Sequence, residues 1–200
     1  ETDLNILEFN LAAKKTLINR ANIDANTLTL NLGDITSNNL KIFSTDTSII
    51  YKNWKDQKSQ WNISNLNLMG QNLETRNSNW LFNNGEVNAK NIILSDSTLF
   101  SYEANILADS MASSNSNYYA EKLLLNIAGV LSSLDDNWRI VPFSDETSET
   151  KTSNAGHFDI KTKKYQLSNS TIQSDKFSLD AEKSTLINSG VASNDINLLS

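Results

Sequence analysis

Apolar and polar residues recur in a fixed order along this chain. Between Phe82 and Leu94, the apolar side chains are Phe82, Val87, Ile92 and Leu94, and the small residue Ala89 lies among them. The order is apolar, four residues, apolar, one residue, small, two residues, apolar, one residue, apolar. Further windows of this form start at Ile18, Leu30, Leu94, Leu167 and Leu186. Recurrence of this kind indicates a repeat architecture.

The two ends of the chain resemble each other over a longer stretch. Residues 9–30 align without a gap onto residues 158–179, so that Phe9 meets Phe158 and Ile23 meets Ile172. Single windows can arise by chance in a chain rich in Asn, Ser and Leu. The ungapped terminal match is harder to explain by chance and favours a true repeat.

The last members of each window alternate with polar residues, as in Leu28-Thr29-Leu30. Alternation at period two puts the apolar side chains on one face of a strand. A short polar tract such as Lys90-Asn91 precedes these strands and is typical of a tight turn. The pattern predicts an all-β chain of short strands, folded as one β-repeat domain over residues 1–200.

Two segments interrupt this pattern. Residues 118–134 place Leu123, Ile127, Val130, Leu131 and Leu134 at helical spacing, which predicts a single helix there. A strand built on Leu123, Leu125 and Ile127 is the alternative for the same segment. Residues 142–156 lack apolar periodicity, which predicts a long loop within the domain.

Composition limits the classes of function. The 200-residue chain has a net charge of -6 and a pI near 4.8, which argues against a nucleic-acid partner. Cysteine is absent, which excludes thiolate metal sites and a thiol nucleophile. No apolar run reaches the roughly 18 to 20 residues of a membrane-spanning helix.

Candidate catalytic groups are few. The one histidine, His157, cannot form a multi-histidine metal site. The acidic pairs Asp135-Asp136 and Asp145-Glu146 could serve a glycosidase, but both lie in turn-like sequence. Trp61 and Trp80 alternate with other apolar residues, which favours burial over a sugar-binding platform. We therefore expect no enzyme, no metal site and no cofactor.

The strand GEVNAKNIIL and the C-terminal run STIQSDKFSLDAEKSTLINSGVASNDINLL resemble the OstA-like repeats of the lipopolysaccharide-transport family, the LptA- and LptC-like periplasmic bridge proteins. The likeness covers residues 158–200 best, then 7–42, and then 80–109. It implies an elongated antiparallel β-jellyroll, a taco-like folded sheet whose apolar face forms an open trough. The region 110–156 departs from the family pattern, as does the acidic balance of the chain.

If the resemblance holds, it implies a non-enzymatic lipid-binding or lipid-transport bridge whose trough holds the acyl chains of lipid or lipopolysaccharide. It also implies edge-strand pairing with related jellyroll proteins, and a place in the periplasm or cell envelope, with room for an inner-membrane anchor in a segment preceding Glu1. The predicted groove residues are Ile23, Leu28, Leu30, Val87, Ile92, Leu94, Ile172, Phe177 and Leu179. A dry closed core is the alternative explanation for the same residues.

A second architecture also fits the pattern. Asn39, Asn65 and Asn91 are spaced 26 residues apart, which would suit a parallel β-helix with an asparagine ladder. That fold favours a surface adhesin or a polysaccharide-binding protein. The remaining repeats do not keep a period of 26, and glycine is scarce for tight coils, with 6 residues in the chain.

Overall fold

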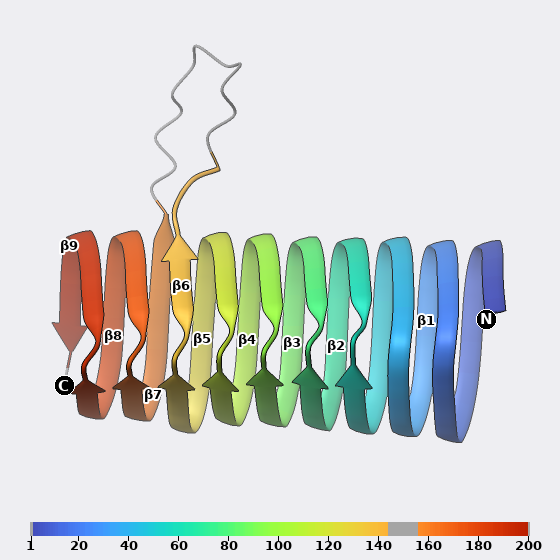
Figure 1. Cartoon of the computed structure of the whole chain (residues 1–200), viewed down its shortest axis with the longest axis horizontal. Helices are drawn as coiled ribbons and strands as arrows, with labels where there is room; N and C mark the ends of the chain where they lie inside the picture. The colour runs from blue at the N-terminus through green and yellow to red at the C-terminus, as the bar shows by residue number, and fades with distance from the viewer. Residues whose placement is uncertain (1, 144–155, 200) are drawn as a thin grey trace, which may run out of the picture.

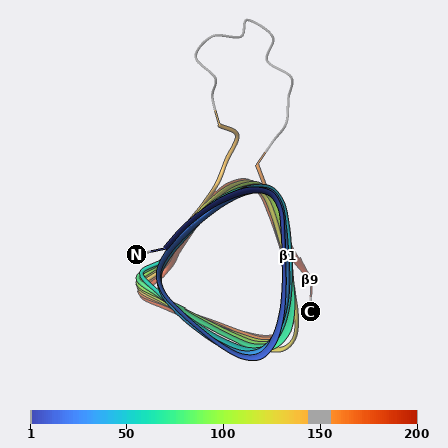
Figure 2. The same ribbon diagram turned by 90° about the vertical axis from the view of Figure 1, so that its right-hand side faces the viewer.

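The computed structural model describes residues 2–143 and 156–199, and they form a parallel β-solenoid (Figure 1). The chain winds in stacked coils around one axis, and the view down that axis shows a triangular outline (Figure 2). The nine strands form a single sheet in the order β1-β2-β3-β4-β5-β6-β8-β7, with β9 paired to β8. Every strand pairing is parallel.

The strands follow the coils closely. The first strand winds through several coils without a break, and the later strands each cover one coil or part of one. Their bounds are β1 Thr2–Gln57, β2 Gln60–Arg76, β3 Asn79–Ser95, β4 Thr98–Ser114, β5 Asn117–Leu134, β6 Asn137–Ile140, β7 His157–Ser168, β8 Thr171–Ile187 and β9 Gly190–Leu199.

The repeat length is 19 residues. Lys41 pairs with Gln60, and Gln60 pairs with Asn79, so each residue lies beside the residue 19 positions further along. We call such a row of stacked residues a column. Within a coil, side chains alternate between the interior and the surface until a corner places two outward residues in succession. The windows found in the sequence mark the inward positions of this coil.

The predicted antiparallel jellyroll is wrong. Alternation of apolar and polar residues arises equally in parallel and antiparallel strands, so it did not determine the direction of the neighbouring strand. The structure has the shape of the alternative architecture, the parallel β-helix, with a period of 19 rather than 26. Consequently Asn39, Asn65 and Asn91 do not share one column.

The predicted helix at 118–134 is also wrong, because these residues form strand β5. Leu123, Leu125 and Ile127 point inward and are at most 2% exposed, as the alternative strand interpretation required. A register shift between Ile127 and Val130 adds one residue to this coil. This bulge brings Leu131 inward, and it produced the helix-like spacing.

The predicted loop at 142–156 lies largely outside the described residues. The repeat stops after Ile140, at the end of β6, and resumes at His157, at the start of β7. Lys122 of β5 pairs with His157, while Ala120 of the same strand pairs with Ile140. Strands β6 and β7 therefore belong to a single coil that an excursion of the chain interrupts.

One corner of each coil uses left-handed backbone geometry. Positive φ angles near 50° occur once per coil, at Asn or Asp in every case except Arg20 and Lys58. Asn and Asp tolerate this conformation better than other residues with a Cβ atom. The residues are Arg20, Asn39, Lys58, Asn77, Asp96, Asn115, Asp135, Asn169 and Asn188. Asparagine thus supplies a turn that glycine would otherwise provide.

The interior is a continuous apolar core. Aromatic rings stack from coil to coil within it: Trp61 and Trp80 have centroids 4.6 Å apart, and those of Tyr118 and Trp138 are 3.6 Å apart. Trp61, Trp80 and Trp138 are at most 4% exposed. The prediction that Trp61 and Trp80 are buried is confirmed.

Candidate functional site

The predicted groove residues all lie in the core. Each of the nine belongs to the buried apolar cluster inside the coils, and none is more than 5% exposed. The set comprises Ile23, Leu28, Leu30, Val87, Ile92, Leu94, Ile172, Phe177 and Leu179. The structure brings them together as one interior, and their contact with acyl chains stays a prediction.

A column of buried serines runs along the left-handed corner. The backbone N–H of Ser59 donates to Ser78 Oγ at 3.1 Å, and that of Ser78 donates to Ser97 Oγ at 3.2 Å. Each hydroxyl thus satisfies a backbone donor of the preceding coil at a place where the ladder turns. The column stabilises the corner and is closed to solvent.

Asp136 takes the place of a serine in this column. Its Oδ1 accepts the backbone N–H of Ser116 at 2.8 Å, and its Oδ2 accepts the hydroxyl of Ser133 at 2.6 Å. Burial raises the pKa of the Asp136 carboxyl, while these hydrogen bonds act in the opposite direction. With 3% of its surface exposed, Asp136 cannot meet a large substrate.

Asp56 lies in a similar environment near the other end of the serine column. Its carboxylate accepts hydrogen bonds from the hydroxyls of Ser37, Ser59, Ser78 and Thr75. Burial again raises the pKa of the carboxyl. The four hydroxyls use its acceptor capacity, which indicates a structural role.

Outside the core, asparagines form ladders along two columns. Asn72 Nδ2 donates to Asn53 Oδ1 at 2.6 Å, and Asn91 Nδ2 donates to Asn72 Oδ1 at 2.7 Å. In a second ladder, Asn84 Nδ2 donates to Asn65 Oδ1 at 3.2 Å. The asparagine ladder expected for a parallel β-helix is therefore present with other members. These amides are engaged with one another, so they are poorly placed to bind a ligand.

A different surface carries exposed aromatic side chains. One column on it stacks in register from β1 to β6: Phe43, Asn62, Leu81, Phe100, Tyr119 and Arg139. We call this the aromatic column. Phe43 is 44% exposed and Leu81 is 39% exposed, while Phe100 and Tyr119 are half-buried. Large apolar groups in a straight row on a solvent-facing sheet are typical of a binding surface.

A second column runs beside the aromatic column, two residues earlier in each coil. Its members are Lys41, Gln60, Asn79, Thr98, Asn117 and Asn137. Unlike the amides of the ladders, the side chains of Gln60, Asn79 and Asn117 make no hydrogen bond to other described residues. We call this the amide column, and the two columns together form the aromatic face.

Two hollows lie on the aromatic face on either side of Phe100. The first, of about 340 Å³, has buried Trp61 and Trp80 at its floor, with Phe43 and Leu81 also lining it. The second, of about 300 Å³, is lined by Phe100, Tyr119, Arg139, Val141, Pro142 and Phe143. They form an interrupted trench along the aromatic column.

The start of the excursion shapes the second hollow. The ring of Phe143 stacks on Phe100 with centroids 4.5 Å apart, and it meets Tyr102 edge-on at 5.3 Å. The backbone N–H of Phe143 donates to Glu121 Oε1 at 2.9 Å. These contacts fix an aromatic wall on one side of the hollow.

Two larger hollows on the other faces lack exposed aromatic rings. One, of about 520 Å³, is lined by amides and acids that include Asp46, Glu86 and Glu103. The other, of about 580 Å³, is lined by the ladder asparagines and by Ile93. In both, lining residues already bond to neighbours in their own column, as Asn65 does to Asp46 at 2.8 Å.

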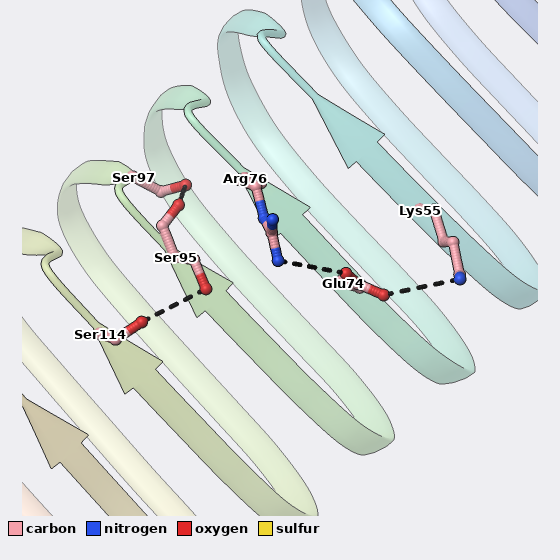
Figure 3. A network of polar contacts seen from close by, with 6 residues as sticks. All are labelled: Lys55, Glu74, Arg76, Ser95, Ser97 and Ser114. Carbon is pink, nitrogen blue, oxygen red and sulfur yellow. Dashed lines mark hydrogen bonds and ion pairs between the residues drawn. The ribbon is translucent and has the colours of Figure 1, made fainter.

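Charges on the surface tend to pair across neighbouring coils. Glu74 lies 3.9 Å from Lys55 of the preceding coil and also 3.9 Å from Arg76 of its own coil (Figure 3). Lys122 pairs with Glu103, which precedes it by one coil. Hydroxyls follow the same arrangement, since Ser114 Oγ donates to Ser95 Oγ at 3.3 Å (Figure 3).

The remaining candidate groups from the sequence do not assemble into a catalytic site. His157 is half-buried, and its column neighbours are Lys122 and Lys176. Asp135 is exposed at the left-handed corner while Asp136 points into the core. Asp145 and Glu146 lie outside the described residues. Residues 2–143 and 156–199 contain no group of three or more potential metal ligands.

Sequence reasoning missed the aromatic face. The tryptophans drew attention as a sugar platform, yet they are buried, and the exposed rings are phenylalanine and tyrosine. The signal was present: Asn62, Leu81, Phe100 and Tyr119 follow one another at intervals of 19 residues. Folding the sequence at that period would have aligned them.

Comparisons of this chain with protein-family models, with curated proteins and with solved structures find no match. Over the described residues, the structure contains no helix with the length and apolar character needed to span a bilayer. The resemblance to the lipopolysaccharide-transport family, the edge-strand partners and the periplasmic or envelope location stay predictions.

Proposed function

We propose that this protein is a non-enzymatic binding protein that holds a polysaccharide chain along its aromatic face. The observation that carries the proposal is the aromatic column, exposed and straight over the coils of β1 to β6, with an amide column beside it. Of the two architectures considered from the sequence, the parallel β-helix was the one associated with polysaccharide recognition.

The chemistry of this face suits sugar rings. A pyranose ring presents C–H groups on its faces and hydroxyls on its rim, so it stacks on an aromatic ring and forms hydrogen bonds at its edge. Phe100 and Tyr119 supply the aromatic platforms. Gln60, Asn79 and Asn117 supply amide donors and acceptors that have no partner among the described side chains.

The repeat supports a polymeric ligand over a small one. Columns in a solenoid present the same surface at each step of about 4.8 Å along the axis. The trench therefore runs parallel to the solenoid axis, and an extended chain can contact several coils at once. Each contact is weak alone, but contacts along one chain add to the total affinity.

The charge of the aromatic face also favours sugars. The whole chain has a net charge of -6, yet the amide and aromatic columns from β1 to β6 carry only Lys41 and Arg139 as charged groups. Hydroxyl-rich polymers are recognised by neutral hydrogen-bonding groups and aromatic rings. A surface without acidic side chains in its two columns avoids repelling polymers that carry negative charge.

The proposal of a non-enzymatic role follows from the acidic groups near the trench. Hydrolysis of a glycosidic bond normally requires two carboxyl groups that flank it. Glu121 is the acid that contacts the wall of the second hollow, and its Oε1 accepts the backbone N–H of Phe143. No second described acid lines either hollow of the aromatic face.

Isothermal titration calorimetry with a panel of soluble polysaccharides tests this function. The panel comprises a mixed-linkage β-glucan, galactomannan, xylan and polygalacturonate. We expect micromolar to millimolar binding of at least one polymer, and a loss of about tenfold in Phe100→Ala and in Tyr119→Ala. Ile93→Ala, which removes an exposed apolar side chain from another face, is the matched control and should bind normally.

Two outcomes would overturn the proposal. One is a panel without any binding. The other is binding that Phe100→Ala and Tyr119→Ala leave intact, or that Ile93→Ala weakens equally.

A further inference from the structure

We infer that the sugar held in the second hollow carries a carboxylate, and that Arg139 binds this group. The inference rests on the proposed function and specifies its ligand as a polysaccharide that contains uronic acid. It is argued from the position of Arg139, from the state of the neighbouring charges and from the geometry of the guanidinium group.

Arg139 lies at the end of the aromatic column, beside the aromatic wall. Its column neighbours are Tyr119 on one side and Gln173 on the other, so neither neighbour carries a charge. The side chain is exposed and lines the hollow of about 300 Å³ together with Phe100, Tyr119 and Phe143. A ring stacked on this wall would place its substituents within reach of the guanidinium group.

The nearest acid along the chain of contacts is already engaged. Glu121 accepts the backbone N–H of Phe143 at 2.9 Å, which directs one of its oxygens toward the excursion. Other cations pair with acids one coil away, as Lys122 does with Glu103 and Lys161 with Asp180. Within residues 2–143 and 156–199, Arg139 forms no such ion pair.

The guanidinium group selects for a planar anion. Arginine presents parallel N–H donors that match the two oxygens of a carboxylate, and such bidentate pairs are stronger than hydrogen bonds between neutral groups. A methyl ester of the same sugar keeps the ring and its hydroxyls but loses the charge. The hollow has one cation among its lining residues, which suits a single negative charge per ring.

Polygalacturonate and its fully methyl-esterified form provide a matched pair of probes. At about 0.15 M salt, where distant charges are screened, we expect the acidic polymer to bind about tenfold more tightly than the ester. Arg139→Gln should remove this difference, and Arg139→Lys should restore part of it. Arg76→Gln, a matched substitution of an exposed arginine on another surface, should preserve the difference.

The outcomes separate this inference from the function on which it rests. Equal binding of both polymers, with loss in Phe100→Ala but none in Arg139→Gln, would overturn the carboxylate and leave the polysaccharide function standing. Tighter binding of dextran sulfate than of polygalacturonate would also overturn the choice of a carboxylate. Failure of both polymers and of the whole neutral panel would overturn the function itself.

Discussion

Aromatic rings stack in register both inside and outside this solenoid, and the two sets differ in what surrounds them. Inside, Tyr118, Trp138 and Phe158 lie on consecutive coils and are at most 1% exposed. Outside, Phe100 and Tyr119 also lie on consecutive coils but remain half-buried. The same 19-residue period produces both sets, and the side of the strand decides the role.

The comparison shows how a repeat protein separates stability from recognition. Inward rings are enclosed by the other two sides of the triangle, so they contribute to folding and cannot reach a ligand. Outward rings lie in shallow hollows and contribute less to folding. Adjacent residues such as Tyr118 and Tyr119 therefore serve different purposes, and substitutions at these positions should separate the two effects.

The largest effect should follow removal of an inner ring. Trp138→Ala takes away the ring between Tyr118 and Phe158 and leaves Ser133 Oγ without its indole donor, now 3.0 Å away. We expect the free energy of unfolding to fall by about 3–5 kcal/mol. Chemical denaturation measures the change. Tyr119→Ala on the outer surface is the control, and a comparable loss in that variant would contradict the comparison.

The next effect concerns the buried carboxyl of Asp136. Burial raises its pKa in the folded protein, so the folded state holds a proton that the unfolded state releases. Stability should therefore fall as the pH rises through the unfolded value of 3.8 and up to the raised folded pKa, and the deficit should persist above it.

Asp136→Asn removes this charge and keeps an oxygen for the N–H of Ser116. Denaturation midpoints between pH 3 and pH 8 should decline less in the variant than in the wild-type protein. Asp135→Asn, one residue earlier and exposed, is the control. A variant whose decline with pH matches that of the wild type would refute this reason for the pH dependence.

A smaller gain should come from the left-handed corner. Lys58 has a φ of 57° at a position where most coils place Asn or Asp. Lys58→Asn should raise the free energy of unfolding by about 0.5–1 kcal/mol, because asparagine adopts this conformation at lower cost. Lys52→Asn, at an exposed site without positive φ, should give no comparable gain. Thermal unfolding of both variants decides the point.

The smallest effect on stability should occur on the aromatic face. Phe100→Ala should change the free energy of unfolding by less than about 1 kcal/mol, since the ring is half-buried and packs mainly on Phe143. Polysaccharide binding should nevertheless fall. Loss of several kcal/mol in this variant would mean that the outer ring is part of the core.

The repeat could be predicted from the sequence, but the direction of its strands was not. The windows that start at Leu167 and Leu186 are one coil apart, and those at Ile18 and Leu94 are four coils apart. The extra residue near Gly129 and the excursion after Ile140 shift the spacing between Leu94 and Leu167. These two interruptions hid the period, which is the feature that distinguishes a parallel solenoid from an antiparallel sheet.

Burial was easier to predict than the binding surface. Trp61, Phe82 and Ile92 stand at inward positions that alternation alone identifies. Phe43 and Phe100 stand at outward positions, where a lone aromatic residue in the sequence looks incidental. Their common column becomes visible only when the coil length is known, because it joins residues that are 19 or 38 positions apart.

Nuclear magnetic resonance of protein labelled with ¹³C-phenylalanine compares inner and outer rings in one titration. Phe43, Phe100 and Phe143 lie on the aromatic face, whereas Phe82, Phe158 and Phe177 lie in the core. Addition of the polysaccharide that binds in calorimetry should shift the ring signals of the outer three and leave those of the inner three in place. Shifts confined to the inner rings, or unchanged ring signals while the polymer binds, would contradict recognition by the aromatic face.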